Sequence, residues 1–257
     1  MIGLVGAGQM GGALLRGWLK HGRPPGEVVV VDPNPGEVAS QAIAEGARHG
    51  EGFLGDCDTV VLAIKPQMFA QVAPNLAPHI AESALVVSIL AGTRIATLQA
   101  ALPGRAVVRA MPNTPASLGR GVSGLFAPVS DSLAARARAV LEPAGAVVRV
   151  ESERDLDRVT AVSGSGPAYV FHMVEALEHA AREVGLANET ARQLARHTLV
   201  GAAALLEGGE AGALREAVTS PNGTTQAGLE VLMAELPDLV ARTVEAAFRR
   251  AEELGGD

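Results

Sequence analysis

The stretch IGLVGAGQMGGALLRGWLKHG, Ile2 to Gly22, decides the fold at the start of the chain. A short apolar run is followed by G-x-G-x-x-G and then by an amphipathic run, which predicts a strand, a glycine turn and a helix. Gly6 makes the tight turn, Gly8 lets the backbone approach a pyrophosphate, and Gly11 lets the helix pack closely on the strand. The helix N-terminus supplies amide donors to phosphates. An ordinary glycine turn is the alternative, but the context favours dinucleotide binding by Gly6, Ala7, Gly8, Gln9, Met10 and Gly11.

The next strand, VVVVD from Val28, ends in a carboxylate about twenty residues after the last of these glycines. A carboxylate at this position accepts both ribose hydroxyls of NAD and repels the 2'-phosphate of NADP. Asp32 therefore favours NADH over NADPH as the cofactor. In the alternative interpretation, loop groups such as Asn34 leave room for the phosphate and Asp32 turns away.

Further apolar runs begin at Thr59, Ala84, Ala106, Gly121 and Ala146 and alternate with predicted helices. Nearly continuous apolar strands are typical of a parallel sheet covered on both faces, so we predict a doubly wound α/β domain of the Rossmann type. Ligands bind at the carboxyl ends of such strands. The candidate cofactor residues there are Ala63, Ile64, Lys65, Pro66, Ala91, Gly92 and Asn113. For Lys65 an exposed strand-end cation, and for Asn113 a turn cap between prolines, are the alternatives.

After about Arg154 the sequence contains no convincing strand. GPAYVFHMVEALEHAAREVGL and TARQLARHTLVGAAALLEGG predict two long helices, and Gly185 and Pro237 punctuate the rest. The segment from Leu199 to Leu206 is apolar on most of its circumference, which indicates burial against another subunit. We predict a dinucleotide-binding domain at 1–154 and an all-α dimerisation domain at 155–257.

Composition excludes several classes of protein. A net charge of -7, from 21 basic and 28 acidic residues, argues against nucleic-acid binding. Cys57 is the single cysteine, so no intrachain disulfide or thiolate zinc cluster is possible, and this fits a reducing compartment. A strand predicted from Ile2 leaves no room for a targeting segment, and no apolar run is long enough to span a bilayer. We expect a cytoplasmic protein that has no metal site and does not bind membranes.

A second unusual stretch, AVTSPNGTTQAGLE from Ala217, places small hydroxylated residues and glycine among helices. Hydroxyls and free amides at a helix N-terminus form an anion site that needs no basic side chain. The alternative is a simple N-cap, in which Thr224 or Thr225 merely starts the helix.

Five motifs in this order, GLVGAGQMGGALLRG, LAIKPQ, AMPNTP, AVSGSGPAYVF and TSPNGTTQAGL, resemble the pyrroline-5-carboxylate reductase family from Ile2 to about Leu254. The resemblance implies a Rossmann domain, a helical dimerisation domain and a homodimer or a larger ring of dimers. It implies reduction of 1-pyrroline-5-carboxylate to L-proline by NADH or NADPH, the last step of proline synthesis. The substrate carboxylate is then bound by Ser220, Gly223, Thr224 and Thr225.

The resemblance also implies that a hydride adds to the imine carbon and that the ring nitrogen carries a proton. A protonated imine is already electrophilic, so positioning supplies most of the catalysis and no metal is needed. Thr225 is the candidate for a hydrogen bond to the ring nitrogen, and a water is the alternative. Two departures concern the cofactor: Asp32 replaces a small hydroxylated residue common in NADPH-preferring members, and RHGEGFL around Gly50 lacks an asparagine that some members place near the adenosine ribose.

Three other functions share part of this sequence pattern. A β-hydroxyacid dehydrogenase would carry a catalytic lysine on an interdomain helix, whereas both lysines, Lys20 and Lys65, lie in the first half. A dinucleotide-binding module with a vestigial pocket would lack the hydroxyls of the C-terminal loop, which are intact. A reductase of a six-membered cyclic imine stays open, because one methylene is discriminated by only about 1–3 kcal/mol.

Overall fold

The computed structural model describes residues 1–256 and divides into two compact units. The first unit comprises Met1–Ser165 and Ala247–Asp257, and the second comprises Gly166–Ala246. None of the helices in the described part of the chain is long and apolar enough to cross a membrane.

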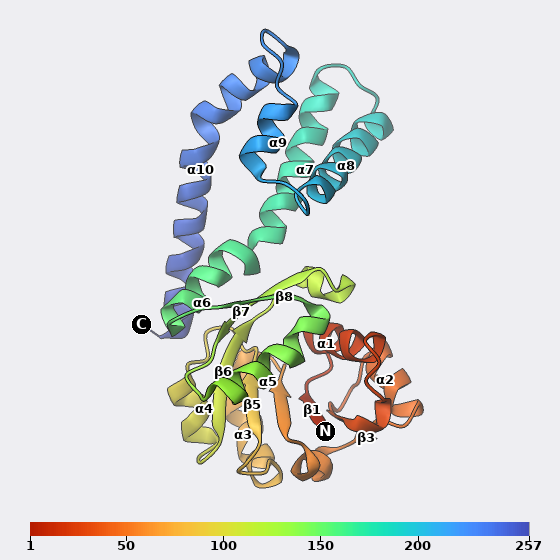
Figure 1. The fold of residues 1–257 in the computed structure, drawn as a ribbon. Coiled ribbons are helices and arrows are strands. Elements are labelled where there is room, and N and C mark those ends of the chain that lie inside the picture. The colour runs from red at the N-terminus through yellow and green to blue at the C-terminus, as the bar shows by residue number, and fades with distance from the viewer. Residues whose placement is uncertain (257) are drawn as a thin grey trace. The chain divides into compact units, whose positions relative to one another are not determined.

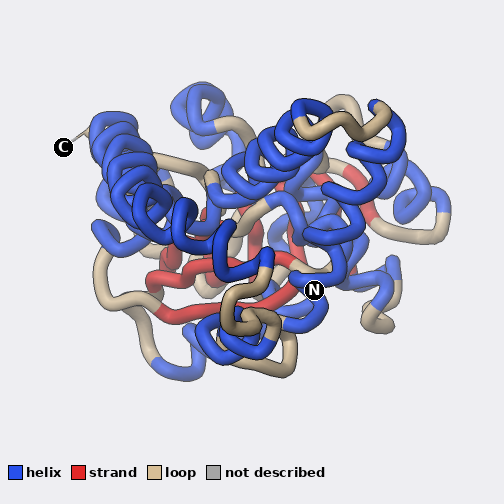
Figure 2. Tube along the Cα trace, turned by 90° about the horizontal axis from the view of Figure 1, so that it is seen from above, coloured by secondary structure: helices blue, strands red, loops and turns tan. Residues whose placement is uncertain are grey.

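The first unit contains an eight-stranded sheet with the order β3-β2-β1-β4-β5-β6-β7-β8. Strand β1 pairs in parallel with both β2 and β4, and its Ile2 lies opposite Val28 and Thr59. The order reverses beside β1, which makes this the switch point where open α/β sheets bind ligands. Figure 2 shows the strands in red, side by side. They are β1 (Ile2–Val5), β2 (Val28–Val31), β3 (Arg48–His49), β4 (Thr59–Leu62), β5 (Leu85–Ser88), β6 (Ala106–Met111), β7 (Gly121–Phe126) and β8 (Gly145–Arg149).

The valines of β2 alternate between two hydrophobic cores, one on each face of the sheet. Val28 and Val30 belong to the core that includes α1, α2 and α5, and Val29 belongs to the core that includes α3 and α4 (Figure 1). Because both faces are covered, the central strands β1, β4 and β5 are buried at every residue. The predicted doubly wound α/β fold is confirmed. Its helices are α1 (Gln9–Lys20), α2 (Glu37–Ala44), α3 (Phe69–Leu76), α4 (Ile95–Ala101), α5 (Asp131–Leu141) and α6 (Glu153–Val159).

The sheet departs from the sequence prediction in two places. Strand β7 runs antiparallel to β6, because the connection between them holds only the 3-10 turn η5 (Thr114–Leu118), too short for the crossover that a parallel neighbour requires. The sheet is therefore mostly parallel, with one antiparallel pair. The two-residue strand β3 was not predicted, since it is too short to show any periodicity.

The second unit is entirely helical over its described residues. It contains α7 (Gly166–Glu183), α8 (Asn188–Leu205), α9 (Ala211–Ala217) and the first part of α10 (Thr224–Gly255). Gly185, with φ of +97°, ends the first of these helices, as its place in the sequence predicted. Pro237 was expected to interrupt the chain but lies inside α10, so that expectation was wrong. Proline costs a helix one hydrogen bond, and a helix of 32 residues tolerates that loss.

The two units divide after Ser165, whereas the sequence predicted a boundary after Arg154. Helix α6 stays with the sheet because it is anchored there by charged groups. The Asp157 carboxylate accepts from the Arg94 guanidinium at 2.9 Å, and the Glu153 carboxylate accepts from Arg109 at 2.7 Å. These anchors are tertiary contacts that a change in residue composition does not reveal.

Candidate active site

The glycine turn between β1 and α1 has the geometry that its spacing predicted. Gly6 has φ of +91°, and a Cβ there would lie 2.7 Å from the carbonyl oxygen of Ala63. A Cβ on Gly11 would overlap the carbonyl oxygen of Gly6. Among the described residues, no atom lies within 4 Å of the position that a Cβ of Gly8 would occupy. The turn is thus packed on its inner side and open at Gly8, which suits close approach by a phosphate.

Asp32 stabilises this turn through hydrogen bonds and also lines the groove beside it. One carboxylate oxygen accepts the N–H of Ala7 at 2.6 Å, and the other accepts the N–H of Asn34 at 2.8 Å. The carboxylate therefore ties the end of β2 to the glycine turn, while each oxygen keeps a further lone pair for a ligand. His49, on the unpredicted strand β3, has Nε2 3.0 Å from the carbonyl oxygen of Asp32.

A groove of about 880 Å³ lies at the carboxyl ends of β1, β2 and β4. It brings together six of the predicted cofactor residues, which come from three separate stretches of sequence. The charged side chains around it are two carboxylates and one lysine, with one histidine. The predicted residues on the groove are Gly6, Gly8, Asp32, Ala63, Ile64 and Lys65.

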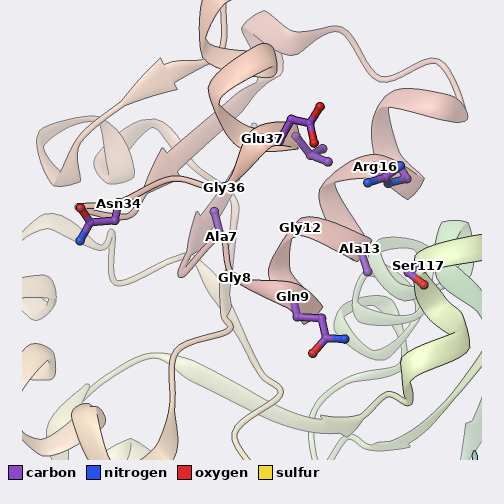
Figure 3. Close-up of a pocket in the computed structure, with 11 residues that line it drawn as sticks. Ala7, Gly8, Gln9, Gly12, Ala13, Arg16, Asn34, Gly36, Glu37 and Ser117 are labelled. Carbon is purple, nitrogen blue, oxygen red and sulfur yellow. The ribbon is translucent and has the colours of Figure 1, made fainter.

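A smaller hollow of about 400 Å³ lies on the other side of Gly8 and shares Asn34 with the groove (Figure 3). Ala7 and Gln9 of the glycine turn line it. Of the other predicted residues, Met10 lies in the first turn of α1 and packs against the hydrophobic core, and Pro66 begins the 3-10 turn η3 (Pro66–Met68). Figure 3 shows side chains of α1 and of the start of α2 on opposite sides of this hollow.

The two remaining strand ends lie outside both hollows. Ala91 is exposed and Gly92 has φ of +69°, and both follow β5 in the loop that leads to α4. Asn113 follows β6 and is buried. Its Oδ1 accepts the N–H of Val122 at 2.9 Å, and its Nδ2 donates to the carbonyl oxygen of Ser163 at 3.1 Å. The Asn113 amide therefore joins β7 to the π-helical turn η7 (Thr160–Gly164).

The C-terminal loop lies in the second unit, directly before α10. Asn222 has φ of +57°, and its N–H donates to the side-chain oxygen of Gln226 at 2.8 Å. A Cβ on Gly223 would lie 3.0 Å from the carbonyl oxygen of Ser220 and would displace the Ser220 hydroxyl, so Gly223 packs closely on Ser220. Ser220, Thr224 and Thr225 are all exposed. The loop thus presents three hydroxyl groups and the start of a 32-residue helix, where the first amides lack acceptors within the helix.

Sequence reasoning missed part of the groove wall. The first turns of α3 contribute polar side chains four residues apart, Gln71 and Asn75, together with Val72 between them. The region of Gly50 contributes His49 and Glu51. The four-residue spacing of Gln71 and Asn75 predicts that they share one face of a helix. The sequence does not indicate which side of the sheet that helix covers.

Comparison with known proteins gives consistent matches along the chain. Residues 153–254 match the family described as pyrroline-5-carboxylate reductase dimerisation, and residues 1–92 match NADP oxidoreductase, coenzyme F420-dependent. A pyrroline-5-carboxylate reductase of Pseudomonas aeruginosa is 39% identical over 98% of this chain and 96% of its own length.

Two solved structures extend these matches. A pyrroline-5-carboxylate reductase from Coxiella burnetii has a TM-score of 0.90 at 35% identity, covering 98% of this chain and 97% of that one. A pyrroline carboxylate reductase of Plasmodium falciparum with NADP bound has a TM-score of 0.82 at 27% identity, covering 99% and 97%. Both resemble this chain across its two units.

Proposed function

This chain belongs to the pyrroline-5-carboxylate reductase family, and from that premise we propose how its residues bind the two substrates and promote the reaction. It is an oxidoreductase of proline biosynthesis that reduces 1-pyrroline-5-carboxylate to L-proline with NADH or NADPH. The observation that carries the proposal is that the same chain holds a groove suited to a dinucleotide, at the Rossmann switch point of the first unit, and a hydroxyl-rich loop before α10 in the second.

The groove residues fit a dinucleotide. The open side of Gly8 and the amides at the start of α1 suit a pyrophosphate, and the adenosine half then lies between the ends of β2 and β4. We propose that Asp32 accepts the adenosine ribose hydroxyls and favours NADH. Support comes from its fixed position, since two backbone N–H groups hold the carboxylate at the mouth of the groove. Ala91, Gly92 and Lys65 are proposed to contact the remainder of the cofactor.

The C-terminal loop is proposed to bind the substrate carboxylate. Its hydroxyls are exposed and the loop leads directly into the N-terminus of α10, so hydroxyl and amide donors are available there without a basic side chain. The proposed carboxylate ligands are Ser220, Thr225 and the backbone N–H groups of Gly223 and Thr224. Within the loop, the Gly223 N–H also donates to the carbonyl oxygen of Ser220 at 3.0 Å. Thr225, in the first turn of α10, is proposed to hydrogen-bond the ring nitrogen.

In the proposed reaction, the bound nicotinamide supplies a hydride to the imine carbon. The C=N double bond becomes a single bond, and the ring nitrogen, already protonated in the iminium form, keeps its proton as a secondary amine. The chain's own residues bind and orient the dinucleotide and the imino acid. Two parts of the chain, the groove and the C-terminal loop, therefore share the catalytic task mainly through positioning.

The subunits are proposed to form a homodimer through the helical unit and to assemble further into a ring of dimers. The match to a dimerisation family supports the homodimer. Val200, Leu205 and Leu206, in the segment that was expected to meet another subunit, are 61%, 60% and 54% exposed in the single chain. The proposed compartment is the cytoplasm. Light scattering should give at least a dimer, and a monodisperse monomer would contradict the proposal.

The first test is the loss of absorbance at 340 nm when purified protein is mixed with 1-pyrroline-5-carboxylate and either NADH or NADPH. We expect turnover with both cofactors and a higher kcat/KM with NADH. A six-membered cyclic imine provides the comparison substrate. Absence of turnover from a folded, oligomeric sample that still binds dinucleotide would reject the proposal.

A further inference from the structure

The last turns of α10 pack on the first unit, although this helix starts in the second unit. Ala251 is buried, and the ring of Phe248 lies beneath two guanidinium groups, those of Arg154 at 5.5 Å and Arg158 at 5.7 Å from the ring centroid. Arg154 also donates to the carboxylate of Glu252 at 2.7 Å. Helix α6 therefore holds the end of α10 through two cation–π contacts and one ion pair.

The same turns of α10 meet the loop that follows β5. A Cβ on Gly92 would lie 2.8 Å from the carbonyl oxygen of Leu254. A Cβ on Gly255 would lie 2.6 Å from Nη2 of Arg94 and 3.0 Å from its Nε. Contact this close between backbone and backbone, and between backbone and guanidinium, means that the path of the loop and the end of the helix are fitted to each other.

The other side of this loop is held by α6. Arg94 donates to Asp157 at 2.9 Å, and their side chains are 15% and 3% exposed. The Glu153 carboxylate accepts the N–H of Ile95, the first residue of α4, at 2.9 Å. A single short helix thus fixes both the loop after β5 and the end of α10 that lies against it.

This loop stands at the carboxyl end of β5, in the half of a Rossmann sheet that holds the second nucleotide of a dinucleotide. The groove that suits the adenosine half involves the ends of β1, β2 and β4 and none of the residues of this loop. Ala91 is exposed at the tip, so a ligand can reach it.

We propose that the end of α10, Phe248 to Gly255, is a positioning element that clamps the loop Ala91–Arg94 and thereby sets the place of the nicotinamide ring for hydride transfer. The inference rests on the proposed function, in which Ala91 and Gly92 contact the cofactor. Phe248 is a positioning residue and touches neither substrate. Loss of the clamp weakens only those interactions that the nicotinamide half makes.

The test compares NADH with ADP-ribose, which has the adenosine and pyrophosphate but no nicotinamide. In the full-length protein, Phe248→Ala should raise the Kd for NADH about three- to tenfold by calorimetry, while the Kd for ADP-ribose changes less than twofold. The kcat should fall by a similar factor with little change in KM for the imino acid. Phe248→Tyr keeps an aromatic ring beneath the guanidinium groups and should restore both values.

Arg250→Ala is the matched control, because Arg250 is exposed in the same turns and forms an ion pair with Glu253 of its own helix. If Phe248→Ala fails to fold, Arg154→Ala provides a second test. Arg154 is 60% exposed, so its replacement should be tolerated, and it removes the ion pair with Glu252. Equal weakening of NADH and ADP-ribose, or no change in either, would overturn the clamp. If the wild-type protein were inactive on the imino acid, the proposed function would be rejected. The Kd values for NADH and ADP-ribose could still be compared between variants, because binding needs no turnover.

Discussion

Replacing Asp32 by serine tests both roles that the structure supports for its carboxylate. One role is charge at the mouth of the groove, which disfavours a 2'-phosphate. The other is structural, since the two oxygens accept the N–H groups of Ala7 and Asn34 at 2.6 and 2.8 Å. Asp32→Ser removes the charge and shortens the side chain, so it should change cofactor preference and loosen the glycine turn together.

The two effects have separate magnitudes. For a charge about 5 Å from the 2'-phosphate, with an effective dielectric constant of about 40 to 80, Coulomb's law gives about 0.8–1.7 kcal/mol per unit of phosphate charge. This corresponds to a shift of about 4- to 16-fold in the ratio of kcat/KM for NADPH over NADH. Loss of a hydrogen bond to a charged group costs about 1.5–3 kcal/mol, and this cost falls on both cofactors alike.

Initial rates at 340 nm with each cofactor measure the ratio, and calorimetry with ADP-ribose measures the shared loss. We expect the NADPH:NADH ratio to rise within the stated range and the affinity for ADP-ribose to fall. Asp32→Asn is the control, because it removes the charge while keeping one acceptor oxygen. An unchanged ratio in both variants would show that Asp32 does not act on the 2'-position and is only a brace for the turn.

Three further predictions concern the glycine turn, the C-terminal loop and the buried cysteine. Gly11→Ala should cost more than about 3 kcal/mol of folding stability by denaturant titration, because its Cβ would overlap a backbone oxygen, whereas Gly8→Ala should keep near wild-type stability and lose cofactor affinity. Ser220→Ala with Thr225→Ala should raise KM for the imino acid by about 10- to 100-fold with an unchanged Kd for NADH, and equal losses of both would indicate misfolding instead. Burial raises the pKa of the Cys57 thiol to about 11, so at pH 8 a thiol reagent should modify the native protein far more slowly than the unfolded one, and equal rates would contradict this burial.

Much of the sheet was predictable because its central strands are buried on both faces. The apolar runs that begin at Val28 and Thr59 are typical of central parallel strands, and they form β2 and β4. Strand β3 was not predictable, since its two residues pair with β2 only through tertiary placement. The direction of β7 was readable in principle from the short link after Met111, although its apolar content alone does not distinguish the two directions.

The candidate site shows a similar division. The glycine spacing and the acidic residue at the end of β2 predicted cofactor residues, and the structure brings these residues together on one groove. Asn113 shows the limit of such reasoning, because its buried amide bonds to two segments distant in the sequence, at Val122 and Ser163. A polar side chain at a strand end can bind the ligand or stabilise the fold. Tertiary contacts decide between these roles, and the local sequence does not show them.

The helical unit gives a physical reason for assembly that is independent of any family. Helix α7 has 18 residues and none of them is buried in the single chain, over the part that the structure describes. Phe171 and Val170 on that helix and Met233 on α10 are 64%, 44% and 53% exposed. A monomeric soluble protein rarely leaves so many large apolar side chains in water. Their burial against a second subunit, at about 25 cal/mol per Å², would stabilise the helical unit, so its folding should be coupled to the protomer concentration.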